Sequence, residues 1–270
     1  MFLAAAVQLT STSDSEANWR SARELIERAA SYGARFVATP ENTNFLGPHD
    51  DKVRLAEPLD GATCSRFAEL AARYGIHLLL GSFNERSDEA ERCHNTSVLF
   101  GPDGSRLATY RKIHLFDVDV SESVRFIESK TVKPGEELVT VATPLAKLGL
   151  SICYDLRFPE LYSKLVADGA EVLTIPSAFT LTTGKDHWHP LMRARAIENQ
   201  CYVIAPAQSG RHDDNGLRES YGHAMIVDPW GQIVAMASDG PGLAVAEIDI
   251  ERVRWCRKAI PVASHRKLTT

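Results

Sequence analysis

The sequence lacks the cysteine spacings and the long hydrophobic runs that mark several classes of protein. Its five cysteines stand at positions 64, 93, 153, 201 and 256, and no CxxC pair occurs. An odd count without paired spacing argues against a disulfide framework and a structural zinc site, and favours a reducing, cytoplasmic compartment. No run approaches the roughly 20 apolar residues of a membrane span. The short stretch MFLAAAVQL has no basic flank, which favours a first strand over a signal peptide.

Glycine motifs that bind phosphate and an excess of basic charge are absent as well. Neither GxGxxG nor the GxxxxGK of a P-loop occurs, so nothing indicates nucleotide binding. A net charge of −5 and a pI of about 6.0 give no reason to expect nucleic acid or an anionic membrane as a partner. The two histidines of HWH, at 187 and 189, fall at a predicted helix start without other ligands, so a helix surface is favoured over a metal site.

What is present is a globular composition with regular alternation of strands and helices. The 270 residues are 44% hydrophobic and 24% charged, enough for one large domain or two small ones. In the first half, the pattern predicts a helix within 11–33, capped by Ser13 in a capping box with Glu16. It also predicts strands in ARFVATP and IHLLLGSF, a helix over 61–75 that ends at Gly75, and a hairpin around Pro102–Gly104.

The second half repeats this order of elements. Gly33 and Gly169 are 136 residues apart in similar stretches, and the turns GPDG at 101 and DPWG at 228 are 127 apart. A repeated unit of strands, helices and a hairpin predicts two sheets that pack face to face, each covered by helices on one side. We therefore expect an α/β fold, a four-layer α-β-β-α sandwich with internal duplication, in a single domain over 1–270. A single α/β sheet with coincidentally similar turns is the alternative.

Three predicted strand ends carry reactive side chains, where sites gather in α/β folds. Cys153 ends the strand GLSIC, and a buried filler residue is the alternative to a nucleophile. A helix predicted just beyond it would lower the thiol pKa and permit labelling below the pH that an ordinary cysteine needs. Glu41 follows FVATP as either a surface carboxylate or a partly desolvated general base. Lys112 and Arg111 are neighbours in a predicted strand, so their side chains point to opposite faces. One of the two can therefore point inward rather than into solvent.

At Glu41, Lys112 and Cys153 taken together, the chain resembles the nitrilase superfamily of carbon–nitrogen hydrolases, which use a Glu-Lys-Cys triad. The matching stretches span nearly the whole chain in family order: FVATPENTNFLG, YRKIHLFDVDV, GLSICYDLRFPEL, IPSAF and HWHPLMRARAIENQCYV. Within the superfamily the chain is most similar to the Nit branch. AQSGRH, SYGHAMIVDPWG and IPVASHRK resemble amidases that act on deaminated glutathione, whereas KIHLFDVDV and AFTLTTG are equally typical of ω-amidases.

The resemblance implies a role for each matching position of the catalytic centre. Cys153 would be the nucleophile, Glu41 the general base, and Lys112 the group that stabilises the oxyanion together with the backbone N–H of Tyr154. A second glutamate, which positions these groups, matches Glu128, although SESV stands where relatives often have a glycine-rich stretch. The resemblance implies no metal ion and no organic cofactor.

Positions that face the substrate in the Nit branch match Arg157, Phe179 and Thr183. An arginine there suits a substrate with a carboxylate, which a guanidinium group binds bidentately. The resemblance thus implies an amidase that hydrolyses a small anionic ω-amide to a carboxylate and ammonia through a cysteine thioester. Deaminated glutathione, in metabolite repair, is the expected substrate. An ω-amidase acting on α-ketoglutaramate or α-ketosuccinamate is the alternative, and an inactive binding or regulatory protein on the same scaffold is the alternative of another class.

The expected partners are a small-molecule amide and further copies of the chain, as a homodimer or larger assembly, with neither nucleic acid nor membrane. The tail at about 259–270 is expected to dock on a partner subunit, with a flexible terminus as the alternative. The loops 46–54 and 210–220 are expected to set the width of the pocket, in conformations that the sequence does not give.

Overall fold

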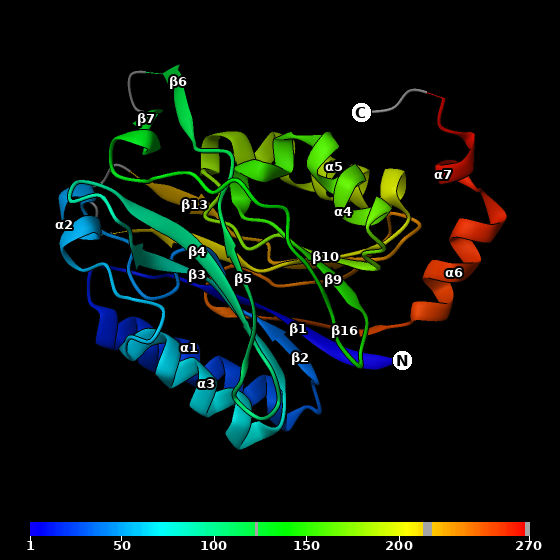
Figure 1. Cartoon of the computed structure of the whole chain (residues 1–270), viewed down its shortest axis with the longest axis horizontal. Coiled ribbons are helices and arrows are strands. Elements are labelled where there is room, and N and C mark those ends of the chain that lie inside the picture. The colour runs from blue at the N-terminus through cyan, green and yellow to red at the C-terminus, as the bar shows by residue number, and fades with distance from the viewer. Residues whose placement is uncertain (122–123, 213–217, 268–270) are drawn as a thin grey trace.

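Four layers of secondary structure make up the computed structural model, which describes residues 1–121, 124–212 and 218–267 (Figure 1). Helices α1 (Ser15–Ser31) and α3 (Ala62–Tyr74) cover the outer face of a first sheet. Helices α4 (Pro159–Ala167) and α5 (Leu181–Asn199) cover the outer face of a second sheet. The two sheets meet through their inner faces, so the predicted α-β-β-α sandwich is confirmed.

The first sheet has the strand order β13-β12-β1-β2-β3-β4-β5, and β16 also pairs with β1. Strands β1, β2 and β3 are parallel, and β4 and β5 return as an antiparallel hairpin. The strands are β1 (Phe2–Leu9), β2 (Phe36–Ala38), β3 (His77–Arg86), β4 (Cys93–Phe100), β5 (Arg106–Arg111), β12 (Ala207–Arg211), β13 (Glu219–Tyr221) and β16 (Gly242–Ile248).

The second sheet has the order β15-β14-β11-β10-β9-β8 and repeats the same topology. Strands β9, β10 and β11 are parallel, and β14 and β15 are antiparallel, as β4 and β5 are in the first sheet. The strands are β8 (Thr140–Ala142), β9 (Lys147–Leu150), β10 (Val172–Thr174), β11 (Tyr202–Ala205), β14 (Met225–Val227) and β15 (Ile233–Met236).

Matching glycines support the internal duplication. Gly33 and Gly169 each follow a helix with positive φ, at 87° and 96°. Gly104 and Gly231, in the turns of the two hairpins, have φ of 81° and 82°. Glycine adopts this left-handed region at little cost, which explains why it stands at the same place in both halves. The predicted hairpins and duplicated order of elements are confirmed.

Strand alternation divides the core into two clusters. On β1, Ala4 and Ala6 face the second sheet, whereas Ala5 and Val7 face α1 and α3. Successive side chains of a strand point to opposite faces, so a strand buried on both sides is apolar throughout. The cluster between the sheets is the larger and continues beneath α4 and α5, where Trp188 is fully buried.

The start of α1 differs from the predicted capping box. Asp14, not Ser13, is the N-cap, because its carboxylate accepts the backbone N–H groups of Glu16 and Ala17 at 3.0 and 2.9 Å. The Glu16 side chain does not reach back to the cap and instead pairs with Arg66 of α3 at 2.7 Å. The predicted end of the second helix is confirmed, because α3 ends at Gly75 in the left-handed conformation.

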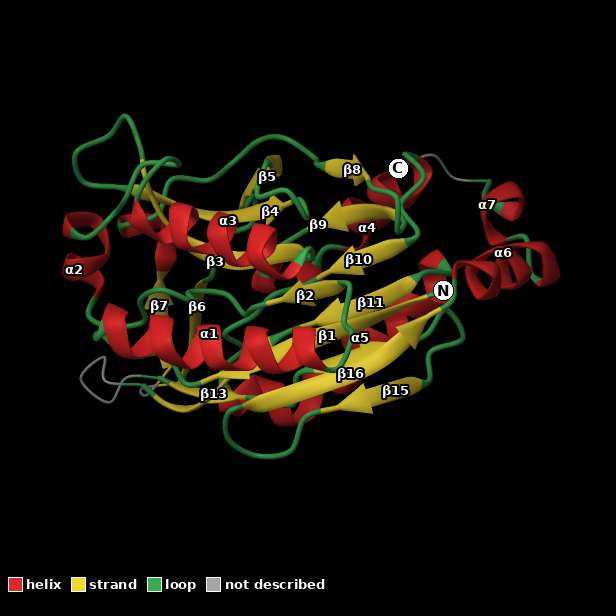
Figure 2. Ribbon diagram, turned by 90° about the horizontal axis from the view of Figure 1, so that it is seen from below, coloured by secondary structure: helices red, strands yellow, loops and turns green. Residues whose placement is uncertain are grey.

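The remaining elements lie at the two ends of the sandwich. The predicted pocket loop 46–54 contains the helix α2 (His49–Arg54), and the loop 210–220 joins β12 to β13, with 213–217 outside the described residues. The hairpin β6 (Asp117–Ser121) and β7 (Val124–Ile127) precedes a short helix, η1 (Glu128–Lys130). Helices α6 (Ile250–Ala259) and α7 (Val262–His265) stand beyond the sheets near the N-terminus (Figure 2). Among the described residues, no helix has the length and apolarity to cross a membrane.

Candidate active site

Three acidic and basic side chains of the first half meet at the inner edge of its sheet. Glu41 lies in the turn after β2, Lys112 follows β5 directly, and Glu128 begins η1. The Lys112 ammonium group lies 2.9 Å from Glu41 Oε1 and 2.9 Å from Glu128 Oε2. All three side chains are buried, with at most 3% of each residue exposed. The structure therefore places both predicted glutamates on the predicted lysine, out of solvent.

The two oxygens of the Glu41 carboxylate have different partners. Its Oε1 accepts hydrogen bonds from Lys112 and, at 2.8 Å, from the side-chain amide of Asn95. Its Oε2 accepts the backbone N–H of Ala178 at 2.8 Å, in the turn after β10 of the second half. Glu41 therefore spans the boundary between the two sheets.

Cys153 reaches the same boundary from the second half. It follows β9 and opens a short 3₁₀ helix, η2 (Cys153–Arg157), with φ of 48°, a left-handed conformation that is unusual for a side chain other than glycine. Its backbone N–H donates to Pro176 O at 2.9 Å. Its thiol lies within electrostatic reach of the Glu41 carboxylate. A strained backbone position that presents a thiol to a carboxylate indicates a functional site rather than a packing residue.

The electrostatics of the thiol differ from the sequence prediction. Burial and the charge of Glu41 raise the pKa of the Cys153 thiol well above its usual value, and Lys112 only partly offsets them. The predicted lowering by a helix N-terminus is wrong, because α4 begins only at Pro159 and the five-residue η2 intervenes. Cys153 therefore rests as a protonated thiol, and a base must remove its proton during reaction.

Lys112 and Glu128 stabilise each other's charged forms. Burial disfavours the Lys112 ammonium, yet the Glu128 and Glu41 carboxylates outweigh it and hold the lysine pKa well above its usual value. Burial likewise acts to raise the pKa of Glu128, but Lys112, Lys52 and the Phe116 N–H lower it below the usual range. The cluster thus holds a fixed cation and a fixed anion next to the thiol.

Of the predicted substrate-facing residues, Arg157 and Phe179 lie beside Tyr154 of η2. The Arg157 guanidinium lies over the rings of Tyr154, at 5.8 Å, and Phe179, at 5.2 Å. It also lies 3.4 Å from His187 Nδ1. Thr183 is in the first turn of α5, where its hydroxyl forms a hydrogen bond with the hydroxyl of Thr180 at 2.8 Å. Tyr154, the second residue of η2, has its N–H among the first groups of a helical turn, which lack a partner within it.

Several residues of the site had no recognised signal in the sequence. Asn95 on β4 bonds Glu41 at 2.8 Å and Glu128 at 3.4 Å. Lys52 on α2 is 1% exposed and lies within electrostatic reach of Glu128, yet it forms no ion pair with any residue that the structure describes. A charged residue on a short polar loop predicts exposure, so only the folded chain reveals this buried cation.

The sequence predicts a helix over 186–200, with Arg195 and Glu198 paired on its surface at a spacing of three residues. The ion pair exists at 2.7 Å, but Arg195 itself is 5% exposed. Its Nε and Nη2 donate to the carbonyl of Leu156 at 3.0 and 2.7 Å. A side chain of α5 therefore holds the backbone of η2 in place. The helix α5 also begins five residues before the predicted start, which places HWH in its interior.

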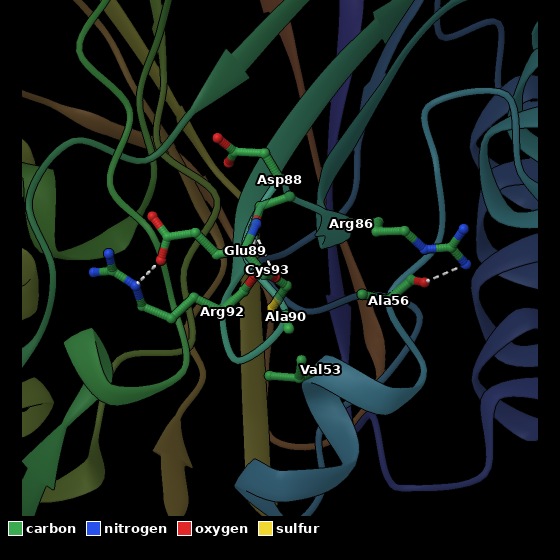
Figure 3. A pocket seen from close by; sticks show the side chains of 9 residues that line it. Val53, Ala56, Arg86, Asp88, Glu89, Ala90, Arg92 and Cys93 are labelled. Carbon is green, nitrogen blue, oxygen red and sulfur yellow. Dashed lines mark hydrogen bonds and ion pairs between the residues drawn. The ribbon is translucent and has the colours of Figure 1, made fainter.

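A separate cavity of about 340 Å³ lies beside α2 and the β3–β4 turn (Figure 3). Its charged residues already have partners: Arg92 pairs with Glu89, Arg86 donates to Ala56 O, and Asp88 pairs with Lys133 outside the cavity. Cys93 forms part of its wall. Across the three described stretches of the chain, no group of three or more histidine, cysteine, aspartate or glutamate residues is arranged to hold a metal ion.

Comparison with known proteins identifies the family of the chain. The profile of the family described as "Carbon-nitrogen hydrolase" matches residues 3–258, and the chain belongs to that family. It is 47% identical to the deaminated glutathione amidase of Synechocystis sp., covering 98% of both chains. It is 46% identical to the bovine deaminated glutathione amidase, covering 98% of this chain and 82% of that protein.

A solved structure agrees with this assignment. The crystal structure of the Caenorhabditis elegans NitFhit protein superposes with a TM-score of 0.93 at 43% identity, over 98% of this chain and 65% of that one. The curated name of the worm protein describes a nitrilase and fragile histidine triad fusion. The predicted nitrilase-superfamily membership, Nit-branch similarity and enzyme class are confirmed.

Proposed function

We propose that the chain is an amidase in which Cys153 is the nucleophile, Glu41 the general base and Lys112 the oxyanion-stabilising cation. The observation that carries this assignment is the geometry around Glu41. One of its oxygens binds Lys112 at 2.9 Å, and its carboxylate also acts on the thiol. Glu128, at 2.9 Å from Lys112, keeps that lysine charged and in place.

The first half of the reaction forms a thioester. Glu41 accepts the proton of the Cys153 thiol as sulfur bonds to the amide carbon, and the carbonyl oxygen becomes an oxyanion. The Lys112 ammonium and the Tyr154 N–H oppose that charge, and losing one such donor costs about a hundredfold or more in rate. Glu41, now protonated, donates its proton to the leaving nitrogen as the carbon–nitrogen bond breaks.

The second half hydrolyses the thioester. Glu41 accepts a proton from water as the water oxygen bonds to the acyl carbon, and the same donors bind the second oxyanion. The carbon–sulfur bond then breaks, and the proton on Glu41 returns to the sulfur of Cys153. The product leaves as a carboxylic acid, which loses its proton to the released amine or to water. Glu41 is again a carboxylate and Cys153 again a thiol at the end of the cycle, which agrees with a thiol that rests protonated.

We propose deaminated glutathione as the substrate, in agreement with the names of the relatives at 46% and 47% identity. Arg157, beside Tyr154 and Phe179, is placed to bind a substrate carboxylate next to the thiol. Ammonia is the leaving group only for a primary amide. Deaminated glutathione is a secondary amide, so its hydrolysis releases the amine of cysteinylglycine together with α-ketoglutarate.

The alternative ω-amidase substrate, α-ketoglutaramate, uses the same mechanism and releases ammonia. The two are separated by comparing kcat/KM for deaminated glutathione, α-ketoglutaramate and intact glutathione, with α-ketoglutarate and the amine or ammonia both measured. Cys153→Ala is the blank. A preference for deaminated glutathione supports the proposal, and a preference for α-ketoglutaramate replaces it with the ω-amidase. Absence of Cys153-dependent product from all three favours the inactive binding protein.

We also propose that one domain over residues 1–270 assembles as a homodimer or larger homo-oligomer in a reducing, cytoplasmic compartment. Five free, buried cysteines fit that compartment. An exposed apolar face supports assembly, since the edge strand β15, α5 and α6 contribute large side chains that are 36–50% exposed: Ile197, Trp230, Ile233, Val234, Met236 and Trp255. The following tail, 259–270, is proposed to dock on the partner. Light scattering that finds a monomer, or a Trp255→Glu variant that stays dimeric, contradicts assembly through this face.

A further inference from the structure

Asp155 is completely buried two residues after Cys153, and the reaction described above leaves it without a role. Its Oδ2 accepts hydrogen bonds from the Tyr110 hydroxyl at 2.7 Å and from the Ile152 backbone N–H at 2.8 Å. Its Oδ1 accepts the His114 backbone N–H at 3.1 Å and contacts His114 Nδ1 at 2.7 Å. A carboxylate cannot donate, so the His114 ring donates through Nδ1.

The donors to Asp155 come from both halves of the duplicated fold. Tyr110 stands two residues before Lys112, and His114 stands two residues after it. Ile152 immediately precedes Cys153. One carboxylate therefore binds the backbone directly before Cys153 and the chain on either side of Lys112, through the Tyr110 hydroxyl and the His114 backbone N–H. The His114 ring is further fixed by stacking on Phe158, with ring centroids 3.7 Å apart and planes 9° from parallel.

Only a carboxylate satisfies this set of donors. Each of its oxygens accepts one backbone N–H, from Ile152 on one side and His114 on the other. A backbone N–H can neither rotate away nor reverse its polarity. An asparagine has a single oxygen, so in either orientation its amide group would face a backbone N–H without an acceptor. The other donor to Oδ2, Tyr110, is held in its protonated form, because burial and then Asp155 raise its pKa.

We propose that Asp155 is a positioning residue that fixes the Lys112 ammonium relative to the Cys153 thiol across the two halves. This inference rests on the roles proposed for Lys112 and Cys153. Effective general-base and oxyanion chemistry depends on placement, and a displacement of about 1 Å can cost about a hundredfold in rate. The role is carried entirely by hydrogen bonds, and Asp155 itself contacts neither substrate nor the reacting atoms.

The test is Asp155→Asn, compared in kcat, KM and the rate of Cys153 alkylation by iodoacetamide. We expect kcat to fall by about a hundredfold with little change in KM, because binding groups stay in place while the reacting groups separate. Lys112 lowers the pKa of the thiol, so its displacement raises that pKa and slows alkylation at a given pH. A residue that only stabilised the fold would not slow alkylation of the folded fraction.

Asp228→Asn is the matched control, since it makes the same change at another buried carboxylate. Asp228 is 5% exposed, and its Oδ1 accepts the backbone N–H groups of Trp230 and Gln232, each at 2.9 Å. It lies in the β14–β15 turn, at the edge of the second sheet opposite Cys153. We expect a lowered Tm with kcat retained.

Three outcomes overturn the inference. They are an Asp155→Asn protein with unchanged kcat, one whose kcat loss matches its unfolded fraction, and one with normal alkylation. If Asp155→Asn does not fold, Tyr110→Phe is the second variant, because it removes a single donor to Asp155 and leaves both backbone contacts. We expect Tyr110→Phe to lose kcat several-fold. An unchanged kcat in that variant overturns the inference. An active Cys153→Ala protein would instead refute the proposed function and leave the geometry of Asp155 untouched.

Discussion

At the level of single residues, the Glu41 carboxylate has two effects on Cys153 that substitution separates. In the proposed mechanism Glu41 accelerates hydrolysis as the general base, yet its negative charge helps to raise the pKa of the thiol. We expect Glu41→Gln to lower kcat for amide hydrolysis by about a hundredfold or more, because general-base catalysis contributes about that much. The same substitution removes a negative charge and should increase the fraction of thiolate at a given pH.

The measurement is the rate of alkylation by iodoacetamide between about pH 6 and pH 10, with Cys153→Ala as background. Glu41→Gln should shift the profile to lower pH while hydrolysis is lost. Parallel loss of alkylation and hydrolysis would show that Glu41 assists the thiol rather than suppressing its ionisation.

Lys52 offers a second prediction, because its charged form lowers the pKa of Glu128, although burial and then Arg218 lower the pKa of Lys52 itself. Lys112 and then Lys52 lower the pKa of Glu128 against the effect of burial. Lys52→Met should therefore raise that pKa, so that Glu128 becomes protonated and releases Lys112 at a higher pH than before. Because the native pKa lies below the unfolded value of 4.5, Glu128 stabilises the fold above that pH, and this contribution is lost as the pH falls through the native pKa.

The acid limb of kcat/KM for Lys52→Met should thus move to higher pH, measured between about pH 4 and pH 8. The matched control is Lys133→Met, which removes a lysine that pairs with Asp88 at 2.6 Å and has no contact with the cluster. Identical profiles for the two variants would mean that Lys52 has no influence on Glu128.

The residues that follow strand ends could be predicted from the sequence, whereas those that act through tertiary contacts could not. Glu41 and Cys153 each follow a recognisable apolar strand, and Lys112 follows the return strand of a hairpin, so their position at the sheet edge follows from local pattern. Lys52 and Asp155 depend on which distant segments pack on them. The preference for Asp14 over Ser13 as the cap also depended on the actual backbone at the start of α1.

At the level of elements, a bulge in β3 supports the turn that carries Glu41. The pairing of β3 with β4 shifts register between Leu80 and Phe83, and a Cβ at Gly81 would lie 1.8 Å from Thr39 O. Gly81→Ala should push the turn after β2 away from β3. We expect kcat to fall about tenfold or more, together with a lower Tm, because Glu41 moves with that turn.

Gly33→Ala is the control for this prediction. Gly33 has φ of 87° and no atom within 4 Å of an added Cβ, so alanine there meets backbone strain alone. That strain costs about 1 to 2 kcal/mol and should lower Tm without changing kcat. If the two variants lose stability equally and neither loses kcat, the bulge does not position Glu41.

Elements with strong local signals could be predicted, and those shaped by their surroundings could not. The hairpins around Gly104 and Gly231 follow from turn chemistry. The first turn of α5 carries threonines and Gly184, which favour a loop, yet Gly184 packs so closely on Tyr221 that a Cβ would lie 2.3 Å from it. Tertiary packing against β13 therefore decides where this helix begins.

At the level of the whole molecule, the duplication could be predicted from the repeated turns, because each repeat has its own glycines and hairpin. The face-to-face packing of the two sheets followed from the need to bury one face of each. The repeats did not reveal which residues of the first half contact the second half. Those contacts depend on side chains such as Glu41, which bonds across the boundary between the two sheets.

That boundary has a consequence for how the chain can be divided. Glu41, Lys112 and Glu128 precede the loop at about 134–139, and Cys153 follows it, so neither half holds a complete set of reactive groups. Two polypeptides separated at Glu137, which is exposed, should each be inert, and their mixture should regain hydrolysis through complementation. The recovered rate, measured against concentration, would report the affinity of one half for the other. In that sense the enzyme is a heterodimer whose subunits happen to be joined by a peptide bond.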